Sequence, residues 1–270
     1  SRPVSPRLAL PRCQLGPTAT AMHLDILHDS AGVLAVAKPA GLATQAAHGV
    51  PSVESLMRER LFGGAATGAL ALGRRRHPGG FLGVPHRLDR AVSGVLLLAT
   101  TPRAARQLSR QFERRHVGKT YLAVVVAGPI APAVGETLTW HDLIRKLRDQ
   151  PRAEIVQPDT EPTTGDREAI TTGRVRATAQ DTVLLELHPR TGRMHQLRVQ
   201  AAARGMPVLG DVMYGGRSLA PASEPSDERT RPIALHAWRI EFTNPETGLP
   251  IAVTCPPPAY QPWTTYTGHI

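Results

Sequence analysis

The chain contains little cysteine, only Cys13 and Cys255. Two cysteines so far apart provide neither a disulfide framework nor the close spacing of a zinc site. We therefore expect a protein of a reducing compartment, the cytoplasm. The sequence also lacks an apolar run of the ~18 residues needed to cross a bilayer. The apolar patch at 8–10 is too short and too proline-flanked for a secretion signal, so we expect no membrane association.

Acidic residues are also few, with 22 Asp and Glu against 32 Lys and Arg, a formal net charge of +10. Such a balance favours a polyanionic partner, because clustered Lys and Arg gain affinity by releasing counterions from phosphates. Nucleic acid fits best and an anionic membrane surface second, while a merely solvated basic surface is the plain alternative. Hydrophobic residues make up 41% of the chain, enough to bury a substantial core.

The chain divides into three parts by composition. Residues 1–21 mix Pro, Arg, Ser and Thr without periodicity, and we expect a poorly ordered extension. Residues 22–258 form the predicted folded domain, and 259–270 form a C-terminal tail. The domain shows no internal repeat and no regular strand–helix alternation. We therefore predict the α+β class, with a mixed, mainly antiparallel sheet and flanking helices and loops.

Hydrophobic periodicity and capping signals predict the individual elements. Strands are predicted at 24–27, 33–37, 95–99, 121–126, 183–187, 233–242 and 251–254. Helices are predicted to begin after Ser52, to begin at Thr101-Pro102, and to span 191–204 before Gly205. The polar segments 63–80, 145–166 and 215–231 are predicted to be surface loops, the first of them basic.

Two clusters carry polar chemistry. In the first, His86–Asp89, a carboxylate flanked by cations lies just before a buried strand, which suits catalysis. The alternative is that Asp89 pairs with a nearby arginine and only fixes a turn. In the second, Thr191–Arg198, an arginine could donate bidentate hydrogen bonds to a carboxylate and keep it ionised. A phosphate-binding or solvated basic helix is the alternative there.

Six segments stand in a fixed order along the chain: Lys38–Gly41, His86–Asp89 with Ser93-Gly94, Lys119–Val124, Thr191–Val199, Pro207–Asp211 with Tyr214, and Leu235–Ala237. Taken together they resemble the ordered motifs of the RluA family of RNA pseudouridine synthases. The resemblance covers residues 22–258, which would be the catalytic domain, with a central RNA-binding cleft. One departure is Val92, where the family commonly has Thr before Ser93-Gly94.

The resemblance implies roles for particular residues. Asp89 matches the family's essential aspartate, Tyr121 its active-site tyrosine, and Arg198 the arginine that pairs with the aspartate. Arg87 matches the residue that enters the RNA when the target base leaves, and Leu235 matches an apolar residue of the pocket. Further substrate- or RNA-binding residues are expected in the same motifs: His86, Arg193, His195 and Gln196. By themselves the residues favour packing roles for Tyr121, His195 and His236.

The implied function is isomerisation of uridine to pseudouridine in structured ribosomal or transfer RNA. The uracil N1–C1′ bond breaks and C5 joins C1′, with no metal or cofactor; Asp89 either adds to C1′ or removes a ribose proton. The base must be flipped out of its stack. We expect a monomer. One alternative is a catalytically silent RNA-binding protein, against which the intact Asp89, Tyr121 and Arg198 argue. The other, a metal-dependent nuclease, would need an acidic cluster suited to Mg²⁺.

Overall fold

The computed structural model of the chain describes residues 23–63, 80–128, 132–219 and 230–270. The expected extension at 1–21 lies outside the described residues, as do most of the predicted loop at 63–80 and residues 220–229 of the predicted loop at 215–231. None of the described helices is both long and apolar enough to cross a membrane.

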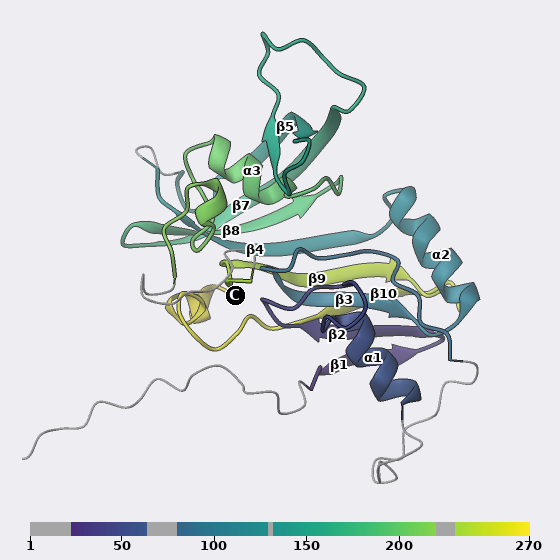
Figure 1. Cartoon of the computed structure of the whole chain (residues 1–270). Coiled ribbons are helices and arrows are strands. Elements are labelled where there is room, and N and C mark those ends of the chain that lie inside the picture. The colour runs from purple at the N-terminus through teal and green to yellow at the C-terminus, as the bar shows by residue number, and fades with distance from the viewer. Residues whose placement is uncertain (1–22, 64–79, 129–131, 220–229) are drawn as a thin grey trace, which may run out of the picture.

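The described residues form one mixed sheet (Figure 1). Its strands lie side by side in the order β1-β2-β3-β9-β4-β8-β7-β5-β6, and β10 pairs with β9. All pairings are antiparallel except that of β3 with β9, which confirms the predicted mixed, mainly antiparallel α+β fold. The strands are β1 (Ile26–Ser30), β2 (Val33–Lys38), β3 (Ser93–Ala99), β4 (Gly118–Val126), β5 (Thr137–Lys146), β6 (Ala153–Ile155), β7 (Arg167–Ala179), β8 (Thr182–Pro189), β9 (Leu235–Thr243) and β10 (Pro250–Thr254).

The parallel contact of β3 with β9 joins the two halves of the sheet. It consists of only two residue pairs, Ser93 with His236 and Gly94 with Ala237. Gly94 has φ 123°, and a Cβ there would lie 2.3 Å from the carbonyl oxygen of Ala237. Only glycine allows so close a backbone approach. Because β3 begins at Ser93, this junction of the two halves lies next to the loop that carries Asp89.

Two helices begin where their capping residues predict. In α1 (Val53–Phe62), Ser52 and Ser55 form a reciprocal capping box. In α2 (Pro102–Glu113), Thr101 accepts a hydrogen bond from the Ala104 N–H, and proline occupies the first turn. The apolar stripe of α2 packs onto the sheet through Ala104 and Leu108.

The third helix, α3 (Gln196–Ala203), begins five residues later than predicted. His195, directly before it, has φ 53°, a left-handed conformation that cannot lie within a helix. Residues 191–195 therefore form a loop. The sequence analysis had predicted a helical turn at these residues.

The sequence analysis missed three strands, β5, β6 and β7, and only β6 lies wholly within the predicted surface excursion at 145–166. Lys146 ends β5, and β6 pairs with β5 through Ala153 opposite Lys146. Strands β5 and β7 alternate buried with polar, solvent-facing residues, so their average hydrophobicity is low. Their period of two was the available signal.

The C-terminal residues pack more closely than the word tail implies. A 3-10 helix, η2 (Trp263–His269), places Trp263 and Tyr266 in the core, both at most 3% exposed. The Tyr266 hydroxyl lies 2.8 Å from Thr182 Oγ1 at the start of β8. These contacts attach residues 263–269 to the sheet. The domain boundaries given above stay a prediction.

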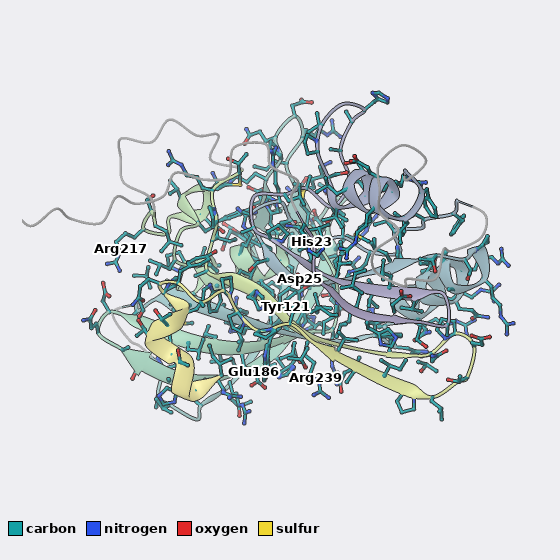
Figure 2. The ribbon with its side chains drawn as sticks, turned by 90° about the horizontal axis from the view of Figure 1, so that it is seen from below. His23, Asp25, Tyr121, Glu186, Arg217 and Arg239 are labelled. Carbon is teal, nitrogen blue, oxygen red and sulfur yellow. The ribbon has the colours of Figure 1, made fainter. Side chains whose placement is uncertain are left out.

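Two large buried clusters form most of the core, one centred on β2 and β3 and the other on β4, β8 and α3. Tyr121 of β4 packs against both clusters. Figure 2 shows it in the interior of the molecule. The side chain expected in the active site therefore lies where the two halves of the molecule meet.

Candidate active site

A cleft of about 1200 Å³ opens beside Tyr121 and the Asp89 loop. Its walls come from the segment before β3, from β4, from the loop between β5 and β6, and from the loop that leads into α3. The predicted excursion thus contributes residues 146–151 to the rim. Cations dominate its charged lining: Arg87, Arg115, Lys119, Lys146, Arg148, Arg190, Arg193 and Arg198, against Asp89, Glu113 and Asp149. Such a surface suits a phosphate-bearing ligand.

Asp89 lies in the tight turn that enters β3, with a side chain 27% exposed. The Val92 N–H donates to the Asp89 carbonyl at 3.1 Å and closes the turn. Thr44 holds the preceding residue, because its Oγ1 donates to the Leu88 carbonyl at 2.9 Å and accepts from the Leu88 N–H at 3.1 Å. The carboxylate is therefore held at the cleft wall by the backbone around it.

Lys38, at the end of β2, supports the same turn from inside. Its Nζ donates to the carbonyls of Pro39, Arg90 and Val92, at 2.9, 3.2 and 2.6 Å. Burial lowers the pKa of Lys38 to about 7, although the Asp89 charge opposes this shift. Val92, the departure from the family pattern, is 2% exposed and packs in the core. Lys38 thus braces the residues that follow Asp89 in the turn.

The expected pairing of Arg198 with Asp89 is present. Arg198 Nη1 lies 3.4 Å from Asp89 Oδ2, and His195 Nε2 lies 3.8 Å from the same oxygen. Arg198 and His195 have side chains only 7% and 10% exposed. One oxygen of a partly open carboxylate therefore faces two buried nitrogen groups.

Asp211, which precedes the short 3-10 helix η1 (Val212–Tyr214), is the stronger partner of Arg198. Arg198 Nε and Nη2 donate to its two carboxylate oxygens at 2.6 and 2.8 Å, and Asp211 is 1% exposed. Burial acts to lower the pKa of Arg198, but the bonds and charge of Asp211 outweigh it and raise that pKa. The sequence analysis gave Asp211 no role; an acid after an apolar Pro207–Gly210 run was the available signal.

Tyr214 connects this pair to the loop between β5 and β6. Its ring lies between the guanidinium groups of Arg152 and Arg198, whose Cζ atoms are 5.2 and 5.1 Å from its centroid. Its hydroxyl accepts from the Ala153 N–H at 3.0 Å and lies 2.9 Å from His195 Nδ1. Burial lowers the pKa of His195, opposed by the Asp89 charge. The contact with the Tyr214 hydroxyl fixes the position of the His195 imidazole, while the His195 backbone is left-handed.

Tyr121 reaches the cleft from the middle of β4, where it lines the wall with Asp89. Burial raises the pKa of Tyr121 far above its usual value, and the nearby Asp89 carboxylate raises it further. The phenol therefore stays protonated at physiological pH. A neutral aromatic ring at this place offers a face for stacking and a hydroxyl that can donate a hydrogen bond.

Gln196 and His86, expected to contact RNA, are engaged within the protein. Gln196 Oε1 accepts from Thr191 Oγ1 and the Arg193 N–H, at 2.7 and 3.0 Å, and its Nε2 donates to β7. His86 Nε2 accepts from the Leu97 N–H at 2.9 Å. Burial lowers the pKa of His86 to about 3, so the imidazole is neutral. Both side chains also line the cleft, so these bonds fix their positions there, and their contact with RNA stays a prediction.

The other expected RNA-binding residues lie in the cleft wall. Arg87 is exposed there, and Leu235, at the start of β9, is 3% exposed. Arg193 donates from Nε to the Glu168 carbonyl at 2.9 Å, which fixes its position on the opposite side. Among the described residues, no three side chains of His, Cys, Asp and Glu are grouped so that they could hold a metal ion.

The chain is similar to known proteins over most of its length. A family model described as RNA pseudouridylate synthase matches residues 32–203. Ribosomal large subunit pseudouridine synthase D of Xylella fastidiosa is 34% identical over 241 residues, which are 87% of this chain and 66% of that protein. The chain thus spans slightly less than two thirds of that relative's length.

Two further similarities extend this result. The dual-specificity RNA pseudouridine synthase RluA of Escherichia coli K12 is 35% identical over 174 residues, 63% of this chain and 71% of that protein. The solved structure of Human RNA Pseudouridylate Synthase Domain Containing 1 is 26% identical with a TM-score of 0.64, and covers 90% of this chain and 86% of that one.

Proposed function

The chain belongs to the RluA family of RNA pseudouridine synthases, and we propose that it isomerises particular uridines to pseudouridine in structured RNA. One observation carries the proposal. In a cleft lined mainly by cations, the partly exposed carboxylate of Asp89 faces Arg198 at 3.4 Å and His195 at 3.8 Å. A carboxylate that faces a fixed arginine, beside a cationic surface that suits phosphate, fits attack on a nucleotide.

Asp89 is the catalytic carboxylate in this proposal. The reaction breaks the bond between uracil N1 and ribose C1′, turns the base and joins C5 to C1′. Asp89 either adds to C1′ or removes a ribose proton while the base leaves, and both routes fit its position. Arg198 orients the carboxylate through this contact. It does so as a fixed group, since Asp211 holds its other edge.

Tyr121 supports the detached base. Because burial raises its pKa, its resting form is the neutral phenol, which suits stacking on uracil and hydrogen bonding better than removal of a proton. The C5 proton then leaves through another group or water. Leu235, buried in the same wall, provides the apolar side of the pocket.

The RNA must present the uridine outside its stack, which costs a few kcal/mol. Arg87, exposed in the cleft, would fill the gap that the flipped base leaves. Loops and bulges of ribosomal or transfer RNA are therefore the favoured targets, because stacking there is already weak. The names of the relatives, a ribosomal large subunit pseudouridine synthase and a dual-specificity RNA pseudouridine synthase, fit such substrates. Action as a monomer in the cytoplasm stays a prediction.

Release of tritium from RNA that carries C5-labelled uridine tests the function directly. Unmodified ribosomal and transfer RNA transcripts should release tritium with the wild-type protein in the presence of EDTA. Asp89→Asn should release none, yet bind the same RNA with similar affinity, because the change removes the charge at nearly constant volume. Substantial turnover by the Asn variant would refute the role of Asp89. Strand cleavage that EDTA abolishes would instead support a nuclease.

A further inference from the structure

Helix α2 carries a row of arginines that do not line the cleft. Arg103, Arg106, Arg110 and Arg114 follow one another at intervals of three, four and four residues, and all four are exposed. Side chains at this spacing share one face of a helix. We call this set the arginine stripe. The buried residues Ala104 and Leu108 occupy the opposite face, so the stripe points to solvent.

The stripe is not neutralised within the described part of the chain. For none of its four side chains does the structure record an ion pair or a hydrogen bond among those residues. Other exposed arginines differ, since Arg217 pairs with Asp181 at 2.5 Å and Arg239 with Glu241 at 2.8 Å. Unpaired guanidinium groups in a row produce a local positive potential, which attracts polyanions.

The N-terminal end of the stripe opposes the stability of its own helix, whereas Arg110, in the last turn, suits the negative end of the helix dipole. The first turn of α2 contains Arg103 and no acidic residue, although the positive end of the helix dipole lies there. Like charges three or four residues apart also repel each other along the stripe. The only acidic residue of the helix, Glu113, lies at its C-terminal end. A local arrangement that costs stability is expected where function requires it.

Contacts fix α2 relative to the cleft. Gln111 exchanges two hydrogen bonds with the backbone of Thr243, both at 2.8 Å, which ties the helix to the end of β9. The ring of Phe112 stacks on that of His86, with centroids 4.4 Å apart. His86 lies three residues before Asp89 in the sequence. Arg115, directly after the stripe, lines the cleft. Helix α2 itself lies at one edge of the molecule (Figure 1), so the stripe extends outward from the basic lining that Arg115 belongs to.

We propose that the arginine stripe binds the phosphate backbone of the RNA that flanks the target uridine. From Arg103 to Arg114 the helix rises ~16 Å, at ~1.5 Å per residue, long enough to follow several nucleotides of one strand. One flipped nucleotide fills the catalytic pocket, so the RNA on either side must leave across the protein surface. Arginine recognises phosphate well and reads no base sequence through it. The inference rests on the proposed function and names the surface that its substrate covers.

Paired variants of equal charge test the stripe. Arg106→Gln with Arg110→Gln removes two stripe cations and keeps good helix formers. Arg217→Gln with Arg239→Gln removes two exposed cations elsewhere; Figure 2 shows Arg217 at the molecular edge, away from Arg239. The probes are two labelled RNA hairpins with the same uridine-containing loop, one with a stem of about four base pairs and one of about twelve, titrated at several salt concentrations.

The stripe variant should bind the long-stem hairpin about tenfold more weakly near 0.15 M salt, with a salt slope shallower by roughly 2. Its affinity for the short-stem hairpin should change less, and its melting temperature should not fall. Arg106→Lys with Arg110→Lys should restore the slope. Equal losses in the stripe and control variants would overturn the proposal in favour of net charge alone. An unchanged long-stem affinity would overturn it too, and would leave the stripe as a solvated face or a surface for an acidic protein.

The same proteins separate this proposal from the proposed function. The control variant should form pseudouridine at the wild-type rate, because Arg217 and Arg239 lie outside the cleft lining. If neither the wild type nor the control forms pseudouridine, the proposed function fails, while the affinities still test the stripe. If both do so and the stripe variant binds like the control, only the proposal about α2 fails.

Discussion

Replacement of Arg198 by Met should reveal two roles of one guanidinium group. Arg198 binds Asp211 through two hydrogen bonds of 2.6 and 2.8 Å, and Asp211 is 1% exposed. The single variant leaves this carboxylate buried without a partner, a change that costs about 3–5 kcal/mol in comparable buried pairs. For a chain of this size the melting temperature should fall by about 10 °C. The stability loss alone would obscure any effect on catalysis.

The double variant Arg198→Met with Asp211→Asn separates the two roles. Without the buried charge it should regain most of the lost stability, while Asp89 still lacks its cation. A hydrogen bond to a charged group contributes about 1.5–3 kcal/mol. The lower value applies here, because the Arg198–Asp89 distance is 3.4 Å and the Asp89 side chain is 27% exposed. The single-turnover rate at saturating RNA should therefore fall about tenfold.

Thermal unfolding and single-turnover tritium release on one RNA measure both effects. A double variant that is stable and turns over at the wild-type rate would show that Arg198 serves only Asp211. A single variant as stable as the wild type would contradict the buried ion pair. A variant that weakens RNA binding with a shallower salt slope, yet reaches the normal rate at saturation, would make Arg198 a phosphate ligand.

Two further predictions follow from buried groups. Tyr121→Phe should slow turnover more than it weakens RNA binding, since the ring still stacks without its hydroxyl; unchanged single-turnover rates would leave Tyr121 with packing alone. Burial lowers the pKa of His236 to about 4, and its ring nitrogens bond Ser93 Oγ and the Cys255 carbonyl. The unfolded His binds a proton near pH 6.5, so unfolding free energy should fall as pH drops from about 6.5 to 4. Urea titrations of His236→Gln should show a weaker fall; an equal one would exclude His236 as the cause.

Local sequence determined much of this molecule. The caps Ser52 and Thr101 and the apolar spacing after them sufficed to predict α1 and α2, because capping and helical periodicity act within a few residues. The continuous apolar run at 95–99 predicted the buried strand β3, because such a run is also a local signal. Asp89, Tyr121 and Arg198 were selected from motif order. The structure brings all three to one cleft.

Tertiary contacts decided the rest. The start of α3 depends on His195, whose left-handed backbone is held by Tyr214 from 19 residues away. Gln196 and His86 also line the cleft, but hydrogen bonds with strands β7 and β3 fix the positions of both side chains. Asp211 became the main partner of Arg198 only because the chain folds the two together in a buried site. The motifs in the sequence identify the candidate side chains. Burial and long-range pairing then decide which hydrogen-bonding groups of those side chains remain available to a substrate.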